Sequence, residues 1–143
     1  MSTTSNDLPK APPVPALGGV IAYLMVDGAS AAAEFYKRAF DAKEVFRYPV
    51  DDQGRTMHIH LHINGSSVML ADFYPEQGHA KEKPQAFLLN LNIHSGIDDW
   101  FKRAVDAGAE VTLPLQQMFW GDRYAQLRDP FGVSWSMNEP QAR

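Results

Sequence analysis

The chain has 143 residues, 45% of them hydrophobic and 21% charged, with a formal net charge of −4, a composition typical of one globular domain. Without cysteine it can form no disulfide, thiolate metal site or cysteine nucleophile, and its scattered Lys and Arg residues argue against nucleic acid as a partner. No apolar stretch approaches the roughly 18 residues of a membrane span and no segment resembles a secretory signal, so we expect a cytoplasmic protein without a membrane partner.

The first half of the chain predicts one strand, one helix and three more strands. Residues 1–18 carry four prolines among Ser, Thr and Asn, which predicts a disordered tail. An apolar run over 20–26 predicts the first strand, and an amphipathic segment around Phe35–Ala42 predicts the helix. Strand patterns follow at 44–50, 56–63 and 66–73, with turn residues between them.

The second half repeats this order after a linker over residues 74–85. Strand patterns lie at 87–93, 110–115, 123–127 and 133–138, and a helix pattern follows the first of them. We therefore predict a single domain over 19–139, with module one at 19–73, module two at 86–139 and a short tail at 140–143.

The two helices also match in sequence. Phe35–Ala42 aligns with Trp100–Ala107 at a constant offset, including an identical Lys-Arg-Ala and Asp-Ala. The repeat predicts an α+β fold in which two tandem βαβββ modules, produced by duplication, form curved mixed sheets around a cleft. On each helix a carboxylate precedes an arginine by four positions, which predicts two surface ion pairs, Glu34 with Arg38 and Asp99 with Arg103.

The Asn64-Gly65 dipeptide predicts a two-residue hairpin and so fixes which strand residues share a face. The face expected against the helices holds Ile59, Leu61, Ile63, Val68 and Leu70, and the opposite face holds His58, His60 and His62. In the second half the expected inner residues are Phe87, Leu89, Leu91, Ile93, Val133, Trp135 and Met137, and the opposite face holds Leu88, Asn90, Asn92, Ser134, Ser136 and Asn138. A cleft lined by the opposite faces could form within one chain or across a dimer.

Several motifs together carry a family resemblance. They are Tyr23–Gly28 leading to Phe35-Tyr36, Met57-His58, Ile63–Ser66 leading to Asp72, and Phe119–Arg123 leading to Asp129–Gly132 with Trp135. With the duplicated βαβββ order, they resemble the vicinal oxygen chelate superfamily, which includes glyoxalase I, extradiol dioxygenases and bleomycin and fosfomycin resistance proteins. In detail the chain resembles the PhnB-like branch.

The resemblance also implies where a metal would bind. In metal-dependent members, each module supplies one His or Glu from its first strand and one from its last. The matching positions here are Ile21 (at most Tyr23), Met69, Leu88 (at most Asn90) and Ser136. None is a His or a carboxylate, so we expect no metal and no cofactor. Whether the protein is an enzyme stays open, and we favour a protein without enzymatic activity.

Candidate ligand-binding residues are His58, His60, His62, Asn90, Trp120, Arg123 and Ser136. Histidines at alternate strand positions project from one face and could share a metal, line a ligand cleft, or have no role. Trp120 and Arg123 could hold a planar or anionic ligand, or could pack the module interface and pair with Asp122 or Asp129. Asp72 is expected to be structural.

The sequence thus favours a metal-free protein, expected to be a homodimer, that holds a small, partly aromatic or anionic molecule in the cleft between the modules. One alternative is a metal-dependent lyase, isomerase or dioxygenase that uses the histidine strand. Another is a dimeric interaction module whose cleft is unused.

Overall fold

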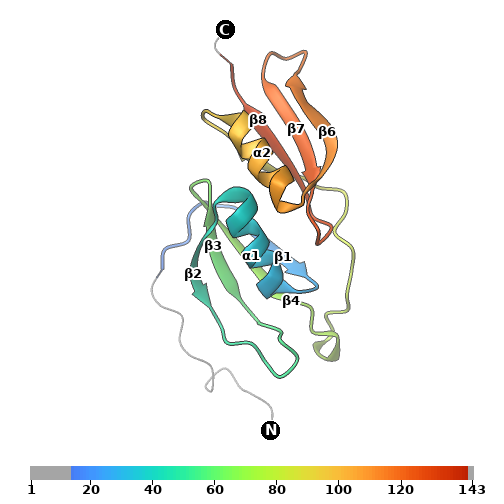
Figure 1. Ribbon diagram of the computed structural model, residues 1–143. Helices are drawn as coiled ribbons and strands as arrows, with labels where there is room; N and C mark the ends of the chain where they lie inside the picture. Colours follow the sequence, from blue (N-terminus) through green and yellow to red (C-terminus); the bar gives the residue numbers. More distant parts are fainter. Residues whose placement is uncertain (1–13, 142–143) are drawn as a thin grey trace.

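The structure, a computed structural model, describes residues 14–141 (Figure 1). Module one consists of β1 (Ala22–Val26), α1 (Ala29–Phe40), β2 (Lys43–Arg47), β3 (Ile59–Ile63) and β4 (Ser66–Asp72). A 3-10 helix, η1 (Pro75–Gln77), lies in the linker. Module two consists of β5 (Leu89–Asn92), α2 (Ile97–Ala107), β6 (Glu110–Gln117), β7 (Arg123–Arg128) and β8 (Ser134–Glu139). The predicted α+β fold of two βαβββ modules is confirmed.

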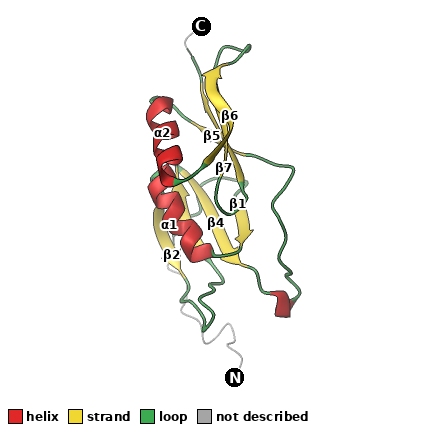
Figure 2. Ribbon diagram, turned by 45° about the vertical axis from the view of Figure 1, so that its right-hand side comes forward, coloured by secondary structure: helices red, strands yellow, loops and turns green. Residues whose placement is uncertain are grey.

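Each module forms one four-stranded mixed sheet. The strand orders are β1-β4-β3-β2 and β5-β8-β7-β6, and in each sheet the first strand runs parallel to the last. Both helices lie on the same side of the sheets (Figure 2), and we call the other side the open face. Within the described part of the chain, no helix is long and apolar enough to cross a membrane.

The hairpin register predicted from Asn64-Gly65 is confirmed. Ile59 lies opposite Leu70 and Leu61 opposite Val68, and all four side chains are buried on the helix side. His60 lies opposite Met69 on the open face, and His62 lies opposite Ser67. Asn64 has the positive φ of 49° that such a turn requires.

The inner face of module two is as predicted for all but one residue. Leu91, Ile93, Val133, Trp135 and Met137 are buried. Phe87, however, is 44% exposed, and β5 begins only at Leu89. The prediction for Phe87 was wrong because this residue lies before the strand begins, where strand alternation does not set the direction of the side chain.

One aromatic core joins the two modules. The ring of Trp135 on β8 lies 4.6 Å from that of Phe40 and 5.3 Å from that of Tyr36, both on α1. The buried carboxylate of Asp129 accepts hydrogen bonds from Tyr36 Oη at 2.6 Å and from Trp135 Nε1 at 2.9 Å. Because these contacts cross from one module to the other, they fix how the two sheets lie relative to one another.

A carboxylate at the end of each last strand holds the start of the helix in the same module. Asp72 Oδ1 accepts hydrogen bonds from the N–H groups of Gly28 and Ala29, both at 2.9 Å, and Oδ2 accepts from Thr56 N at 2.8 Å. Glu139, at the same place in module two, accepts from Ile97 N at 3.1 Å. These bonds satisfy helix donors that have no intrahelical partner, so Asp72 is structural, as expected.

Of the predicted tail, residues 1–13 lie outside the described residues. Leu17 lies against β4, where it exchanges hydrogen bonds with Ser67: Ser67 N donates to Leu17 O at 2.9 Å and Leu17 N donates to Ser67 Oγ at 2.7 Å. The boundaries of the modules at 19–73 and 86–139 stay a prediction.

Candidate functional site

The open face of module one carries a histidine that is hydrogen-bonded to a tyrosine from the neighbouring part of the sheet. Tyr23 on β1 places its hydroxyl oxygen 2.9 Å from Nδ1 of His58. Burial lowers the pKa of His58, so its ring is neutral at pH 7 and Nδ1 can accept the Tyr23 proton. The pair presents one polar edge within an aromatic surface, because the rings of Phe46 and Tyr48 lie 6.3 and 6.2 Å from that of His58.

His60, the next residue along this face, is buried and also hydrogen-bonded. Its Nε2 lies 2.7 Å from Ser67 Oγ. Because that hydroxyl already accepts from Leu17 N, it is placed to donate its own proton to the imidazole. The pKa of His60 is lowered by burial and by the neighbouring His62 and His58, which again favours the neutral ring.

The three histidines of the strand lie close together on the open face. The ring centroids of His58 and His60 are 6.5 Å apart and those of His60 and His62 are 5.1 Å apart. Zinc needs three or four ligands, each about 2.0–2.3 Å from the ion. Among residues 14–141, no group of three His, Cys, Asp or Glu side chains could hold a metal ion.

Module two offers amide and hydroxyl groups where module one offers aromatic and imidazole groups. Asn90 on β5 lies beside Ser136 on β8, whose hydroxyl donates to Asn90 Oδ1 at 2.8 Å. Ser136 is 2% exposed, while Asn90 is open to solvent. Gln126 on β7 donates to the hydroxyl of Tyr124 at 3.1 Å. A ligand beside these four residues would meet uncharged hydrogen-bonding groups.

The two modules present one pair of residues each at equivalent positions. Tyr23 pairs directly with Met69 across β1 and β4, and Asn90 pairs directly with Ser136 across β5 and β8. Tyr23 precedes Asn90 by 67 positions, and Met69 precedes Ser136 by the same number, so the two pairs are equivalent in the repeat. Of the alternatives left open by the sequence, Tyr23 and Asn90, rather than Ile21 and Leu88, are therefore the residues beside Met69 and Ser136.

Two cavities lie along the seam between β1 and β5, where the modules meet. One has a volume of about 450 Å³, and its lining includes Asn90, Ser67 and Ala22. The other has a volume of about 250 Å³, and its lining includes Tyr23 and Phe87. Equivalent residues of the two modules, Tyr23 and Asn90, thus each line a cavity on this seam.

Trp120 and Arg123 do not join the other candidates. The ring of Trp120, in the β6–β7 loop, lies 5.5 Å from that of Tyr124 and 4.9 Å from that of Phe119. Arg123 lies on the helix side and donates to Asp98 of α2 at 2.7 Å, so its partner is neither Asp122 nor Asp129. Its guanidinium therefore pairs with α2 at the surface of the helix side and does not lie on the open face.

Sequence reasoning had not named Tyr23, Phe46, Tyr48 or Ser67 as ligand-binding candidates. Tyr23 was considered only as part of a family motif and as a position where a metal ligand is missing. Strand alternation carried the signal: Leu24 and Val26 are buried in β1, so Tyr23, the residue before Leu24, must project from the open face. Ser67 lies opposite His62 rather than His60, so the hairpin register alone does not indicate its hydrogen bond to His60.

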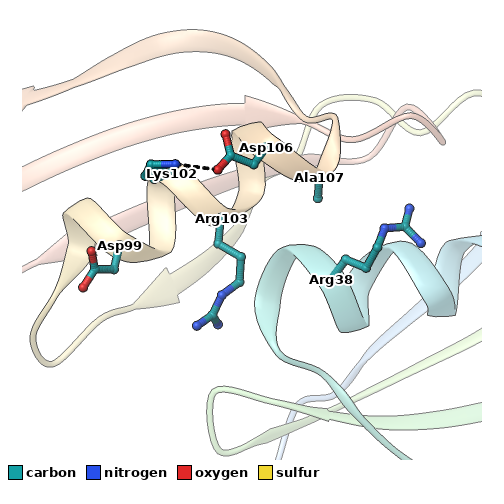
Figure 3. Close-up of a pocket in the computed structure, with 6 residues that line it drawn as sticks. All are labelled: Arg38, Asp99, Lys102, Arg103, Asp106 and Ala107. Atoms are coloured by element: carbon teal, nitrogen blue, oxygen red, sulfur yellow. Dashed lines mark hydrogen bonds and ion pairs between the residues drawn. The ribbon is translucent and has the colours of Figure 1, made fainter.

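A hollow of about 400 Å³ between the helices shows how the matching arginines are arranged (Figure 3). Arg103 extends from α2 toward α1, whereas the side chain of Arg38 on α1 points away from Arg103. Lys102 pairs with Asp106 at 2.7 Å. The predicted pairs of Arg38 with Glu34 and of Arg103 with Asp99 are wrong. Glu34 instead pairs with Lys37 at 2.9 Å, and the two arginines lie near the rings of Phe35 and Trp100.

Comparison with known proteins agrees with this architecture. An uncharacterised protein of Mycobacterium bovis is 42% identical over 123 residues, which cover 82% of this chain and 80% of that protein. A glyoxalase-related enzyme from Fulvimarina pelagi superposes with a TM-score of 0.68 at 22% identity, over 85% of this chain and 87% of the other. A PhnB protein from Bacillus cereus gives a TM-score of 0.66 at 20% identity, over 85% and 99%.

The family model that matches spans residues 19–137, which is most of the chain and both modules. The two four-stranded mixed sheets and two helices seen here match the fold of two βαβββ modules. The chain therefore belongs to the glyoxalase/bleomycin resistance protein/dioxygenase superfamily.

Proposed function

We propose that the protein is a PhnB-like member of this superfamily that binds a small organic molecule, without a metal ion, at the residue pairs Tyr23–Met69 and Asn90–Ser136. One observation carries the proposal: each pair lies side by side on the first and last strands of its module, and none of the four residues is a His or a carboxylate. A phenol, a thioether, an amide and a hydroxyl make a surface for an organic ligand rather than for a hard cation.

The chemistry of the two faces defines the ligand further. On module one, Tyr23 and His58 offer a neutral hydrogen-bonding pair among the rings of Phe46 and Tyr48. On module two, Asn90 offers an amide whose NH₂ group is free to donate, because its Oδ1 accepts from Ser136. A planar, partly aromatic molecule with a carbonyl or hydroxyl group matches both faces.

A thermal-shift screen of aromatic metabolites, run in the presence of a chelator, tests the proposal. A ligand found in this way should raise the melting temperature of the wild type and fail to do so for Asn90→Ala and for a Tyr23→Phe, His58→Gln double variant. Arg103→Gln, on the opposite side of the molecule, is the matched control and should respond as the wild type does. Binding that needs a divalent metal, or that survives both site variants, would overturn the proposal.

We also propose that the protein forms a homodimer, because large apolar side chains are exposed near the seam. Tyr23, Phe87 and Leu88 are each 42% exposed or more. A second copy that covered these residues would convert the open faces into an enclosed cleft. Light scattering after size exclusion should give twice the mass of the chain, and a mass of 16.0 kDa would refute the dimer. A cytoplasmic location stays a prediction.

A further inference from the structure

A larger cavity lies beneath the linker that joins the modules; it adjoins the cavity that Tyr23 lines and shares Met25, Phe73 and Pro84 with it. It has a volume of about 810 Å³, which is within the range of small-molecule sites. Its walls come from the end of β1, from linker residues 81–86 and from the β7–β8 turn. Figure 1 shows this linker running along the outside of the molecule from β4 to β5. We call this cavity the linker pocket.

The linker pocket has an apolar side. Met25, Phe73, Pro84 and Phe131 line it. Phe73 is mostly buried, and Phe131 packs against the central core, so two of these walls are fixed. A Cβ atom at Gly132 would lie 3.5 Å from Pro84 Cδ, which shows that the linker packs directly on the turn. An aliphatic chain or a ring could therefore be held between the linker and module two.

The pocket also has one cation whose side chain has no partner in the described part of the chain. The guanidinium of Arg128, at the end of β7, has no ion pair, hydrogen bond or aromatic contact among residues 14–141. Every other arginine in that range has at least one; these are Arg38, Arg47, Arg55, Arg103 and Arg123. The next residue, Asp129, is committed to Tyr36 and Trp135.

The remaining charges of the lining balance one another. Lys81 pairs with Asp27 at 3.2 Å, and Lys83 follows Glu82 directly in the linker. Counting these two pairs as neutral leaves Arg128 as a single positive charge on a rigid strand. One uncompensated guanidinium beside an apolar wall matches a ligand with one negative charge.

The backbone of the linker supports a binding role. Ala86, which lines the pocket, has a φ of 66°. A residue with a Cβ atom adopts this left-handed conformation only at an energetic cost, and such residues cluster at ligand-binding sites. At Ala86 this conformation lets the linker pass over the pocket before β5 begins at Leu89.

We propose that the linker pocket is a second binding site, for a small amphipathic monoanion. The ligand is a carboxylate with an apolar chain or ring. Its carboxylate accepts two hydrogen bonds from Arg128, and its apolar part packs on Met25, Phe73 and Phe131. This site does not depend on the function proposed above, because the linker pocket uses none of the residues assigned to that function.

Calorimetric titration of the full chain tests this proposal with octanoate as the probe and octanol and octylamine as its uncharged and cationic counterparts. Octanoate should bind at least about tenfold more tightly than either counterpart, which is the effect of one charge-assisted pair. Arg128→Gln should abolish that preference, and Arg128→Lys should retain part of it. Arg103→Gln, an exposed arginine on α2, is the matched control and should bind octanoate as the wild type does.

Three results would overturn the proposal. They are no binding of octanoate, equal binding of octanoate and octanol, and binding of octanoate that Arg128→Gln leaves unchanged. His58→Gln separates this site from the one proposed above, since it should leave octanoate binding intact. Loss of octanoate binding in His58→Gln would place the anion at the histidine face instead and would also refute the linker pocket.

Discussion

The hydrogen bond between Tyr36 and Asp129 ties the two modules together, and Tyr36→Phe removes it without changing the packing of the ring. Burial and the neighbouring Asp129 carboxylate raise the pKa of Tyr36 well above its ordinary value, so the hydroxyl stays protonated and donates. Asp129 is 4% exposed and accepts in addition from Trp135 Nε1, Phe131 N and Val133 N. The variant therefore removes one of four donors to a buried carboxylate.

A hydrogen bond to a charged group contributes about 1.5–3 kcal/mol to the free energy of unfolding. We expect Tyr36→Phe to lower the free energy of unfolding by that amount. Phenylalanine leaves no donor unsatisfied, and the Asp129 carboxylate still accepts hydrogen bonds from its three other donors. Urea denaturation followed by circular dichroism measures the change. Tyr124→Phe is the matched control: its hydroxyl accepts a bond from Gln126 on a partly exposed face, and its loss should be smaller.

A decrease below about 0.5 kcal/mol for Tyr36→Phe would refute the reasoning, because that is the range of ordinary surface substitutions. A double-mutant cycle with Asp129→Asn sharpens the test. If the two groups interact as described, the loss caused by Tyr36→Phe should be smaller in the Asp129→Asn background than in the wild type. Equal losses in both backgrounds would show that the two residues act independently.

Three further predictions concern other parts of the molecule. Asp72→Ala should lower the free energy of unfolding by about 2–4 kcal/mol in urea denaturation, since it leaves three backbone N–H groups without their acceptor. Ala86→Gly should raise it by about 0.5–1 kcal/mol, because glycine adopts positive φ without strain but loses more chain entropy on folding. Burial lowers the pKa of His58 and His60 in the folded state, so the unfolded state binds protons first as the pH falls. The free energy of unfolding should therefore decrease below about pH 6.5, and less steeply in a His58→Gln, His60→Gln variant.

Each of these predictions has a matched control or a contrary outcome. Ala80→Gly, in the same linker but without positive φ, should not stabilise the protein, and equal gains at both sites would exclude strain at Ala86. Asp72→Asn keeps an acceptor and should lose less than Asp72→Ala. The same pH dependence in the wild type and the double histidine variant would show that other groups titrate in this range.

The sequence predicted the parts of the fold that depend on local pattern. The repeat of Phe35–Ala42 at Trp100–Ala107 indicated the duplication, and the Asn64-Gly65 turn placed His60 opposite Met69, as the structure shows. Both signals are read from short contiguous segments, and neither requires knowledge of contacts in three dimensions. The position of Arg123 was available in the same way, because Arg123 is in step with the buried Ala125 and Leu127 and must share their face.

Contacts between distant segments could not be predicted. The bond from Tyr36 to Asp129 joins residues 93 positions apart, and no local pattern indicates it. The hydrogen bond between Tyr23 and His58 depends on the register in which β1 pairs with β4. These two strands are parallel and far apart in the chain, so no turn sequence indicates their register. The linker pocket depends on how residues 81–86 lie against the β7–β8 turn, which is another contact between distant segments.

The metal content of the protein tests the proposed function most directly. The protein is purified without added metal and incubated separately with Zn²⁺, Ni²⁺, Mn²⁺ and Fe²⁺. After desalting, its metal content is measured by inductively coupled plasma mass spectrometry. We expect far less than one metal ion per chain in every case, and a melting temperature that a chelator does not change. One tightly bound metal ion per chain, lost in a His58→Ala, His60→Ala double variant, would contradict the proposal and assign the histidine strand a metal-dependent role.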